Sequence, residues 1–178
     1  MSKYKATLMD SVAVGRVLKR MSHEILEKNG GSDNLCIIGI KSRGVPMAEV
    51  IADNIEQIEG VRVPTGTLDI SFYRDDLERN ADEPVVRNFQ IPFDIEGRVV
   101  ILVDDVLHTG RTARAAMEGI MAHGRAAAIR LAVLVDRGHR ELPIRGDYVG
   151  KNIPTSSSER ISVKFPPYED EVSVELFG

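Results

Sequence analysis

Three short apolar runs that do not alternate with polar residues constrain the fold of this chain more than any other feature. They cover residues 35–40, 99–103 and 129–135. A strand of a parallel sheet is covered on both faces and is apolar throughout, whereas a half-exposed strand alternates apolar with polar side chains. We therefore expect the three runs to be buried strands of a parallel sheet.

Helical patterns lie between and around these runs. Residues 45–58 and 111–123 are expected to form two helices, each followed by a glycine. An earlier helix follows the capping residue Asp10 and ends at Asn29 and Gly30. Its apolar side chains share one face: Val14, Val17, Leu18, Met21 and Ile25. This order of elements predicts an α/β fold with right-handed βαβ crossovers.

Two other regions depart from this pattern. Residues 67–73 alternate like a half-exposed strand, and residues 74–88 form a polar stretch. A polar excursion of that length between strands is either a disordered insertion or a functional lid. Residues 161–165 and 172–176 are expected to form a final hairpin.

Composition narrows the class of protein further. A chain of 178 residues suits a single domain, and a hydrophobic share of 43% is too high for a disordered chain. The one cysteine, Cys36, lies in an apolar run, so we expect a buried core thiol and no disulfide framework. Neither a membrane span nor a signal peptide is visible, which favours a reducing cytosol and no membrane partner.

The charge of the chain is unevenly distributed. The net charge is −4, but residues 166–178 carry four acidic residues and no Lys or Arg. The remainder therefore has 23 acidic residues (27 minus 4) against 23 basic ones. A neutral body leaves room for local basic patches, so the total charge neither requires nor excludes a nucleic-acid partner.

The strongest functional signal follows the second apolar run. Asp104 and Asp105 come directly after the strand, and a short loop with Thr109 and Gly110 then opens a helix at Arg111. The N–H groups of such a loop and of the helix N-terminus can hold a phosphate, and the carboxylates can accept hydrogen bonds from sugar hydroxyls. The spacing differs from that of a P-loop.

This segment resembles the phosphoribosyl-pyrophosphate motif of the type I phosphoribosyltransferases. From about residue 23 to about residue 164, the chain is similar to the family of bifunctional pyrimidine-operon regulators with uracil phosphoribosyltransferase activity. The similarity includes residues 69–77 and the long block over 135–156. The first motif is specific to the superfamily, while the block points to the regulator branch.

The resemblance implies a fold and a reaction. The fold is a single domain over 1–178, with a mostly parallel central sheet flanked by helices. A small hood is formed by about 136–178 and the N-terminal part, and a mobile loop by about 74–88. The reaction converts uracil and phosphoribosyl pyrophosphate to UMP and pyrophosphate, with Mg²⁺ accompanying the substrate and no protein ligand assigned to the metal.

Site residues are carried over by the same resemblance. Asp104, Asp105 and Arg74 form the implied catalytic set, with both carboxylates on the ribose hydroxyls. The residues expected to bind phosphoribosyl pyrophosphate or UMP are Lys41, Ser42, Arg43, Tyr73, Arg87, Asp104, Asp105, Val106, Leu107, His108, Thr109, Gly110, Arg111, Thr112 and Arg137. Relatives often have a cis peptide bond in the turn over 41–43, where the pyrophosphate leaves.

His108 departs from the pattern, because many relatives of the regulator have Tyr there. An imidazole at this place either accepts a proton from the nucleobase or simply replaces Tyr on the loop surface. We therefore leave His108 out of the catalytic set.

RNA binding is the second implied function. The regulator family responds to uridine nucleotides (UMP or UTP) and meets pyrimidine-operon leader RNA on a basic face of a homodimer or higher homo-oligomer. Basic side chains suited to that role are Arg16, Lys19, Arg20, His23, His139, Arg140, Arg145 and Lys151. We expect this surface to lie apart from the active cleft; an ordinary solvated helix face is the alternative for the first four.

Three other functions could use a similar motif. A purine salvage phosphoribosyltransferase would share the ribose and phosphate motif, but the segment over 136–144 argues against its purine clamp. A purely regulatory RNA-binding UMP sensor needs the same nucleotide-binding residues, so the sequence leaves it open. A phosphoacceptor receiver domain is rejected because Asp104 and Asp105 lie too late in the chain.

Overall fold

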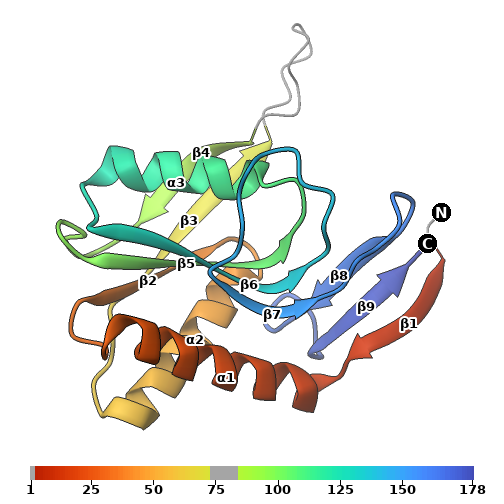
Figure 1. Ribbon diagram of the computed structural model, residues 1–178, viewed down its shortest axis with the longest axis horizontal. Helices are drawn as coiled ribbons and strands as arrows, with labels where there is room; N and C mark the ends of the chain where they lie inside the picture. The colour runs from red at the N-terminus through yellow and green to blue at the C-terminus, as the bar shows by residue number, and fades with distance from the viewer. Residues whose placement is uncertain (1–2, 73–83) are drawn as a thin grey trace, which may run out of the picture.

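The computed structural model describes residues 3–72 and 84–178. Within these residues, two sheets and three helices form a layered α/β structure (Figure 1). In chain order the elements are β1 (Tyr4–Met9), α1 (Ser11–Asn29), β2 (Leu35–Ile40), α2 (Gly44–Glu59), β3 (Thr65–Phe72), β4 (Pro84–Gln90), β5 (Val99–Leu107), α3 (Arg111–His123), β6 (Ala128–Asp136), β7 (Tyr148–Asn152), β8 (Arg160–Lys164) and β9 (Ser173–Phe177).

The larger sheet has the strand order β4-β3-β2-β5-β6-β7. All neighbouring pairs are parallel except β3 with β4, which are antiparallel. The three apolar runs are β2, β5 and β6, which lie side by side at the centre. The predicted mostly parallel sheet is therefore confirmed.

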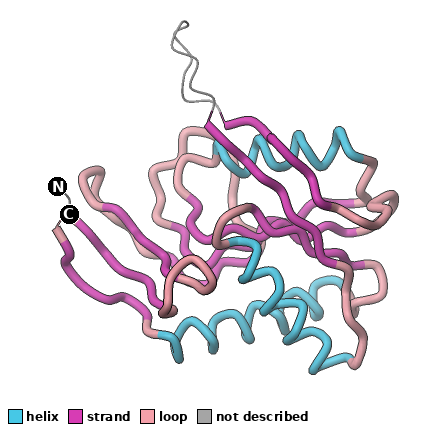
Figure 2. The backbone as a smooth tube through the Cα atoms, turned by 180° about the vertical axis from the view of Figure 1, so that it is seen from behind, coloured by secondary structure: helices cyan, strands magenta, loops and turns pink. Residues whose placement is uncertain are grey.

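Helices cover both faces of this sheet, with α1 and α2 on one side and α3 on the other (Figures 1 and 2). Successive strand residues point to opposite faces, so Ile37 and Ile101 pack in the α1/α2 core while Ile38 and Leu102 pack in the α3 core. Cys36 is fully buried in the second core, and burial raises the pKa of its thiol to about 11. The expected core thiol is confirmed.

The smaller sheet has the order β1-β9-β8. Its β8–β9 hairpin was expected, but β1 was not. β1 is antiparallel to β9, at the far end of the chain, and leads directly into α1. Asp10 caps α1 by accepting a hydrogen bond from the Ala13 N–H at 2.8 Å, as expected.

The sequence expectations need three corrections within the described residues. Residues 84–88, included in the polar stretch, belong to β4 and pair with β3. β7 was not expected, and it completes the edge of the larger sheet beyond β6. β5 continues past residue 103 because Asp104 and Val106 still pair with β6. The rest of the expected mobile loop, 74–83, lies outside the described residues.

No helix in the described parts of the chain combines the length and the apolar character needed to cross a membrane.

Candidate active site

The site lies where the helices that follow β2 and β5 diverge. These strands are parallel neighbours, but α2 crosses one face of the sheet toward β3 and α3 crosses the other face toward β6 (Figure 1). Such a switch point leaves a crevice at the carboxyl ends of the two strands, which is where open α/β sheets bind ligands. The loop over 41–43 (the β2–α2 loop) and the loop over 108–110 (the β5–α3 loop) border it.

The β2–α2 loop lies directly against β5. A Cβ atom on Gly44 would sit 2.4 Å from the Val103 carbonyl oxygen and 3.3 Å from the Asp104 Cα. Only glycine permits this backbone-to-backbone approach. The start of α2, and with it the end of the β2–α2 loop, is therefore held close to the backbone of β5 at Val103 and Asp104.

Asp104 and Asp105 are half-buried at the end of β5. Asp104 Oδ1 accepts the Asp105 N–H at 2.9 Å, and Asp105 Oδ1 accepts the Val106 N–H at 2.8 Å. Burial, and then the adjacent Asp105 carboxylate, hold the pKa of Asp104 well above its ordinary range. Two crowded carboxylates of this kind gain from a ligand that donates hydrogen bonds or carries positive charge.

The β5–α3 loop forms the start of an anion cradle. Gly110 adopts a left-handed conformation (φ 92°) as the residue that precedes α3, and the Arg111 N–H donates to Thr109 Oγ1 at 3.3 Å. Beyond that bond, the first turn of α3 offers further backbone N–H groups, that of Thr112 among them, and its positive dipole end. This is the arrangement expected for a phosphate site.

A segment between β6 and β7, residues 137–147 (the β6–β7 segment), braces that loop from outside. The N–H groups of Glu141 and Leu142 donate to the Thr109 carbonyl at 2.9 and 3.1 Å. Arg140 donates to the His108 carbonyl at 2.8 Å, and the Arg111 guanidinium pairs with Glu141 at 2.7 Å. The block that resembles the regulator branch thus fixes the position of the β5–α3 loop.

His108 stands on the exposed side of this loop, with its ring edge-on to His139 at a centroid distance of 6.1 Å. Partial burial, and then the nearby Arg137 guanidinium, lower the pKa of His108. Both effects favour the neutral ring, and its role toward a nucleobase stays a prediction.

The β2–α2 loop contains the expected cis bond, between Lys41 and Ser42. Lys41 and Ser42 are exposed beside the crevice, whereas Arg43 is half-buried and forms an ion pair with Glu169 from the C-terminal segment. Sequence reasoning placed Arg43 in the site but offered no signal for Glu169, because the two residues are 126 positions apart.

Arg137 has a different environment from the one expected. Its side chain is only 8% exposed, and its guanidinium donates to Thr155 Oγ1 at 3.1 Å and to the Glu159 carbonyl at 2.7 Å. These bonds join the end of β6 to the chain that precedes β8. The guanidinium of Arg137 thus links two segments of the hood, and its expected role around the base stays a prediction.

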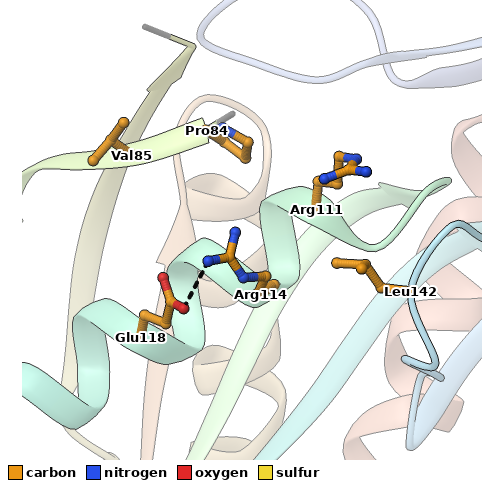
Figure 3. Close-up of a pocket in the computed structure, with 6 residues that line it drawn as sticks. All are labelled: Pro84, Val85, Arg111, Arg114, Glu118 and Leu142. Atoms are coloured by element: carbon orange, nitrogen blue, oxygen red, sulfur yellow. Dashed lines mark hydrogen bonds and ion pairs between the residues drawn. The ribbon is translucent and has the colours of Figure 1, made fainter. Parts of the chain in front are cut away.

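Of the remaining expected site residues, the structure describes only Arg87. Arg87 is exposed on β4, and Tyr73 and Arg74 lie outside the described residues. The beginning of β4 faces α3 across a pocket of about 520 Å³ (Figure 3). Its lining residues are Pro84, Val85, Arg111, Arg114, Glu118 and Leu142. The pocket thus adjoins the helix N-terminus that forms the anion cradle.

The basic residues assigned to RNA fall into two groups. Arg16, Lys19, Arg20 and His23 are exposed on α1, and Arg20 donates to the Gly150 carbonyl on β7 at 2.5 Å, next to exposed Lys151.

The second group lies elsewhere. His139 contacts the Thr155 carbonyl at 2.6 Å, while Arg140 pairs with Asp136 and bonds the His108 carbonyl. These two therefore lie against the β5–α3 loop and not apart from the cleft. Arg145 is exposed on the same β6–β7 segment.

A carboxylate pair, an anion cradle and a second basic loop, all at the switch point of an α/β sheet, define a protein that binds a phosphorylated sugar. Residues 6–170 match the family model described as a phosphoribosyl transferase domain. The fold is also that of two solved structures, with TM-scores of 0.77 and 0.79. The first is a hypoxanthine-guanine phosphoribosyltransferase from Bacillus anthracis (18% identity; 99% of each chain covered), and the second is a hypoxanthine phosphoribosyltransferase from Trypanosoma cruzi (19%; 98% of this chain and 96% of the other).

Curated relatives match more closely in sequence. The "Bifunctional protein PyrR" of Deinococcus deserti is 55% identical over 177 residues (99% of this chain, 97% of the relative), and that of Clostridium acetobutylicum is 56% identical over 173 residues (97% of each). The chain therefore belongs to the phosphoribosyltransferase family and, within it, to the group of bifunctional PyrR proteins.

Proposed function

We propose that this protein regulates pyrimidine biosynthesis genes by binding leader RNA in response to UMP or UTP, and that it also converts uracil and phosphoribosyl pyrophosphate to UMP and pyrophosphate. The observation that carries the proposal is the meeting of Asp104 and Asp105 with the anion cradle and the β2–α2 loop at one switch point. The full-length similarity to PyrR proteins supports it.

In this mechanism the protein positions its substrates and stabilises charge. Residues 109–112 hold the 5′-phosphate, and Asp104 and Asp105 accept hydrogen bonds from the ribose hydroxyls. The bond between the anomeric carbon and the pyrophosphate oxygen breaks toward Lys41, Ser42 and Arg43. The uracil N1 forms the new bond to that carbon and gives its proton to the departing pyrophosphate or to water, while the pyrophosphate keeps the electron pair of the broken bond. Carboxylates beside the sugar stabilise the positive charge that develops on it.

The donor set fits an accompanying Mg²⁺ held mainly by the substrate. No cluster of three His, Cys, Asp or Glu side chains that could hold a metal occurs in the described residues, so the chain offers no complete cage there. Mg²⁺ commonly takes one or two carboxylates and completes its coordination with phosphate oxygens and waters. Asp104 and Asp105 supply such carboxylates, and the ion neutralises charge on the leaving pyrophosphate when bound.

The enzymatic part is tested by an assay of nucleotide formation with phosphoribosyl pyrophosphate and each of four bases: uracil, guanine, hypoxanthine and orotate. We expect UMP to form and the other bases to react far more slowly. A preference for guanine or hypoxanthine would instead establish the purine salvage activity. RNA binding without formation of any nucleotide would leave a purely regulatory UMP sensor.

We propose that RNA contacts the exposed face of α1 together with Lys151 on β7, in a homodimer or larger homo-oligomer. Arg16 and Lys19 are exposed there, and the bond from Arg20 to Gly150 holds α1 against β7. A cluster of basic side chains on one face of a neutral protein is the electrostatic feature of RNA-binding surfaces. His139, Arg140 and Arg145 on the β6–β7 segment are proposed to extend the surface toward the nucleotide site.

The double change Arg16→Ala and Lys19→Ala tests this surface without touching the β5–α3 loop. Loss of two phosphate contacts should weaken binding of a pyrimidine-operon leader hairpin and lower the slope of log K against log salt by about 1 to 2. Filter binding across salt concentrations, with and without UMP, measures both quantities. UMP should tighten the complex if it favours the RNA-competent state.

The matched control is Arg62→Ala, which removes an exposed arginine that follows α2 and pairs with Glu49, Asp53 and Glu56. It should leave affinity and slope unchanged. If both variants bind RNA like the wild type, the α1 face is not the RNA site.

A further inference from the structure

Arg43 is the residue of the β2–α2 loop that the rest of the fold holds in place. Its Nη2 group donates to Oε1 of Glu169, which lies after β8 in the C-terminal segment. Its Nε is buried and has no hydrogen-bond partner within the described residues. Among the described residues, the bond to Glu169 is therefore what orients this guanidinium.

Glu169 is itself fixed by a tight turn. Its second oxygen, Oε2, accepts the Phe165 N–H at 2.8 Å, and the N–H groups of Tyr168 and Glu169 both donate to the Phe165 carbonyl. Phe165 is buried in the α1/α2 core, so the turn is anchored to the body of the protein. The Arg43 guanidinium holds the pKa of Glu169 below its usual range, which keeps the carboxylate charged.

An arginine side chain loses considerable rotamer freedom when a ligand immobilises it. A carboxylate that already holds the guanidinium in place removes part of that loss before the ligand arrives. The Glu169 carboxylate is suited to hold Arg43 in this way, because its turn is fixed to the core. Its Oε2 accepts from the backbone of that turn, and its Oε1 accepts from Arg43.

We propose that Glu169 is a positioning residue that orients Arg43 toward the diphosphate end of phosphoribosyl pyrophosphate. This inference rests on the function proposed above. Glu169 acts through Arg43 and touches neither the substrate nor the reacting atoms. Because Glu169 lies after β8, the C-terminal segment becomes part of the pyrophosphate site. This segment is acidic and would by itself repel pyrophosphate, so it acts through the arginine that it holds.

Glu169→Gln tests the proposal, because the amide oxygen can still accept the Phe165 N–H while the charge that holds Arg43 is lost. We expect the KM for phosphoribosyl pyrophosphate to rise and the affinity for inorganic pyrophosphate with Mg²⁺ to fall, each by about tenfold, with kcat at saturation and thermal midpoint unchanged. Steady-state kinetics and calorimetry measure these quantities. The matched control is Glu171→Gln, two residues along, which loses only an exposed ion pair with Lys164 and should behave like wild type.

A double-mutant cycle separates positioning from general loss of structure. In an Arg43→Ala background, Glu169→Gln should have no further effect on pyrophosphate affinity, because its only route to the ligand is gone. Additive effects would overturn the proposal. If Glu169→Gln lowers the thermal midpoint, the same cycle is run with Glu169→Asp, which keeps the charge but is too short to hold both partners.

Two further outcomes are decisive. Unchanged or tighter pyrophosphate binding by Glu169→Gln would overturn the positioning role, and tighter binding would mean that Glu169 competes with the ligand for Arg43. A wild-type protein that forms no nucleotide and binds no pyrophosphate would instead refute the enzymatic part of the proposed function.

Discussion

Asp104→Asn should reduce the rate of phosphoribosyl transfer by at least about 10²-fold and at the same time stabilise the folded protein at neutral pH. The first effect follows from the loss of a preorganised carboxylate beside the developing positive charge on the sugar. The second follows from the crowding of Asp104 against Asp105, since burial and the neighbouring carboxylate both disfavour the ionised form. Activity and stability are therefore opposed at this residue.

The stability effect has a definite pH dependence. The raised pKa of Asp104 means that the folded state binds the proton more tightly than the unfolded state. The contribution of Asp104 to the stability of the wild type therefore falls as pH rises from the ordinary carboxyl pKa of about 3.9 toward the raised folded value. Asparagine carries no titrating proton, so the stability advantage of Asp104→Asn should grow over that interval and then level off.

Urea unfolding of both proteins over a series of pH values, beside the UMP assay, measures this opposition. Glu118→Gln is a suitable control, because Glu118 is an exposed partner of Arg114 on α3 and should change neither quantity greatly. A pH-independent difference in stability between Asp104→Asn and the wild type would show that the carboxylate pair is not strained.

The middle of the larger sheet could be predicted from the sequence because β2, β5 and β6 each have a local signal. β2, β5 and β6 are apolar over most of their length, and α2 begins and ends within one residue of the expected bounds. β1 and β4 lack such a signal: they are largely exposed and are stabilised by pairing with β9 and β3. For β1 the partner lies at the other end of the chain, where no local pattern indicates it.

The candidate site likewise has a part with a local sequence signal and a part that depends on tertiary contacts. Asp104, Asp105 and the β5–α3 loop could be identified because strand, acids, glycine and helix start are consecutive in the chain. The direction of the Arg137 guanidinium depends on Thr155 and on the Glu159 carbonyl, which the fold brings to it from about 20 residues away. The brace from Glu141 to Thr109 is likewise a tertiary contact. The sequence is therefore enough to locate the β5–α3 loop, whereas the contacts that hold it in place depend on tertiary packing.

Gly44→Ala should disrupt the site as strongly as the loss of a carboxylate, although the change adds only one methyl group. The new Cβ would lie 2.4 Å from the Val103 carbonyl oxygen, and this neighbour is backbone in the central strand. It cannot rotate away, so the β2–α2 loop must separate from β5. Overpacking of this kind costs about 1–3 kcal/mol, and a displacement of about 1 Å in positioning groups can lower the rate about 10²-fold.

Gly15→Ala is the matched control, since it is the same substitution in α1, where no atom lies within 4 Å of the added Cβ. There alanine should stabilise the protein by about 0.5–1 kcal/mol through its better helix propensity, with activity unchanged. Thermal unfolding and kcat/KM for phosphoribosyl pyrophosphate are compared for the two variants. Val103 is held between β2 and β6, so the β2–α2 loop, not β5, has to move. The Gly44→Ala protein should therefore lose catalytic efficiency even at temperatures where it remains fully folded. Wild-type efficiency in a folded Gly44→Ala protein would mean that the close approach of this loop to Asp104 is not required for the reaction.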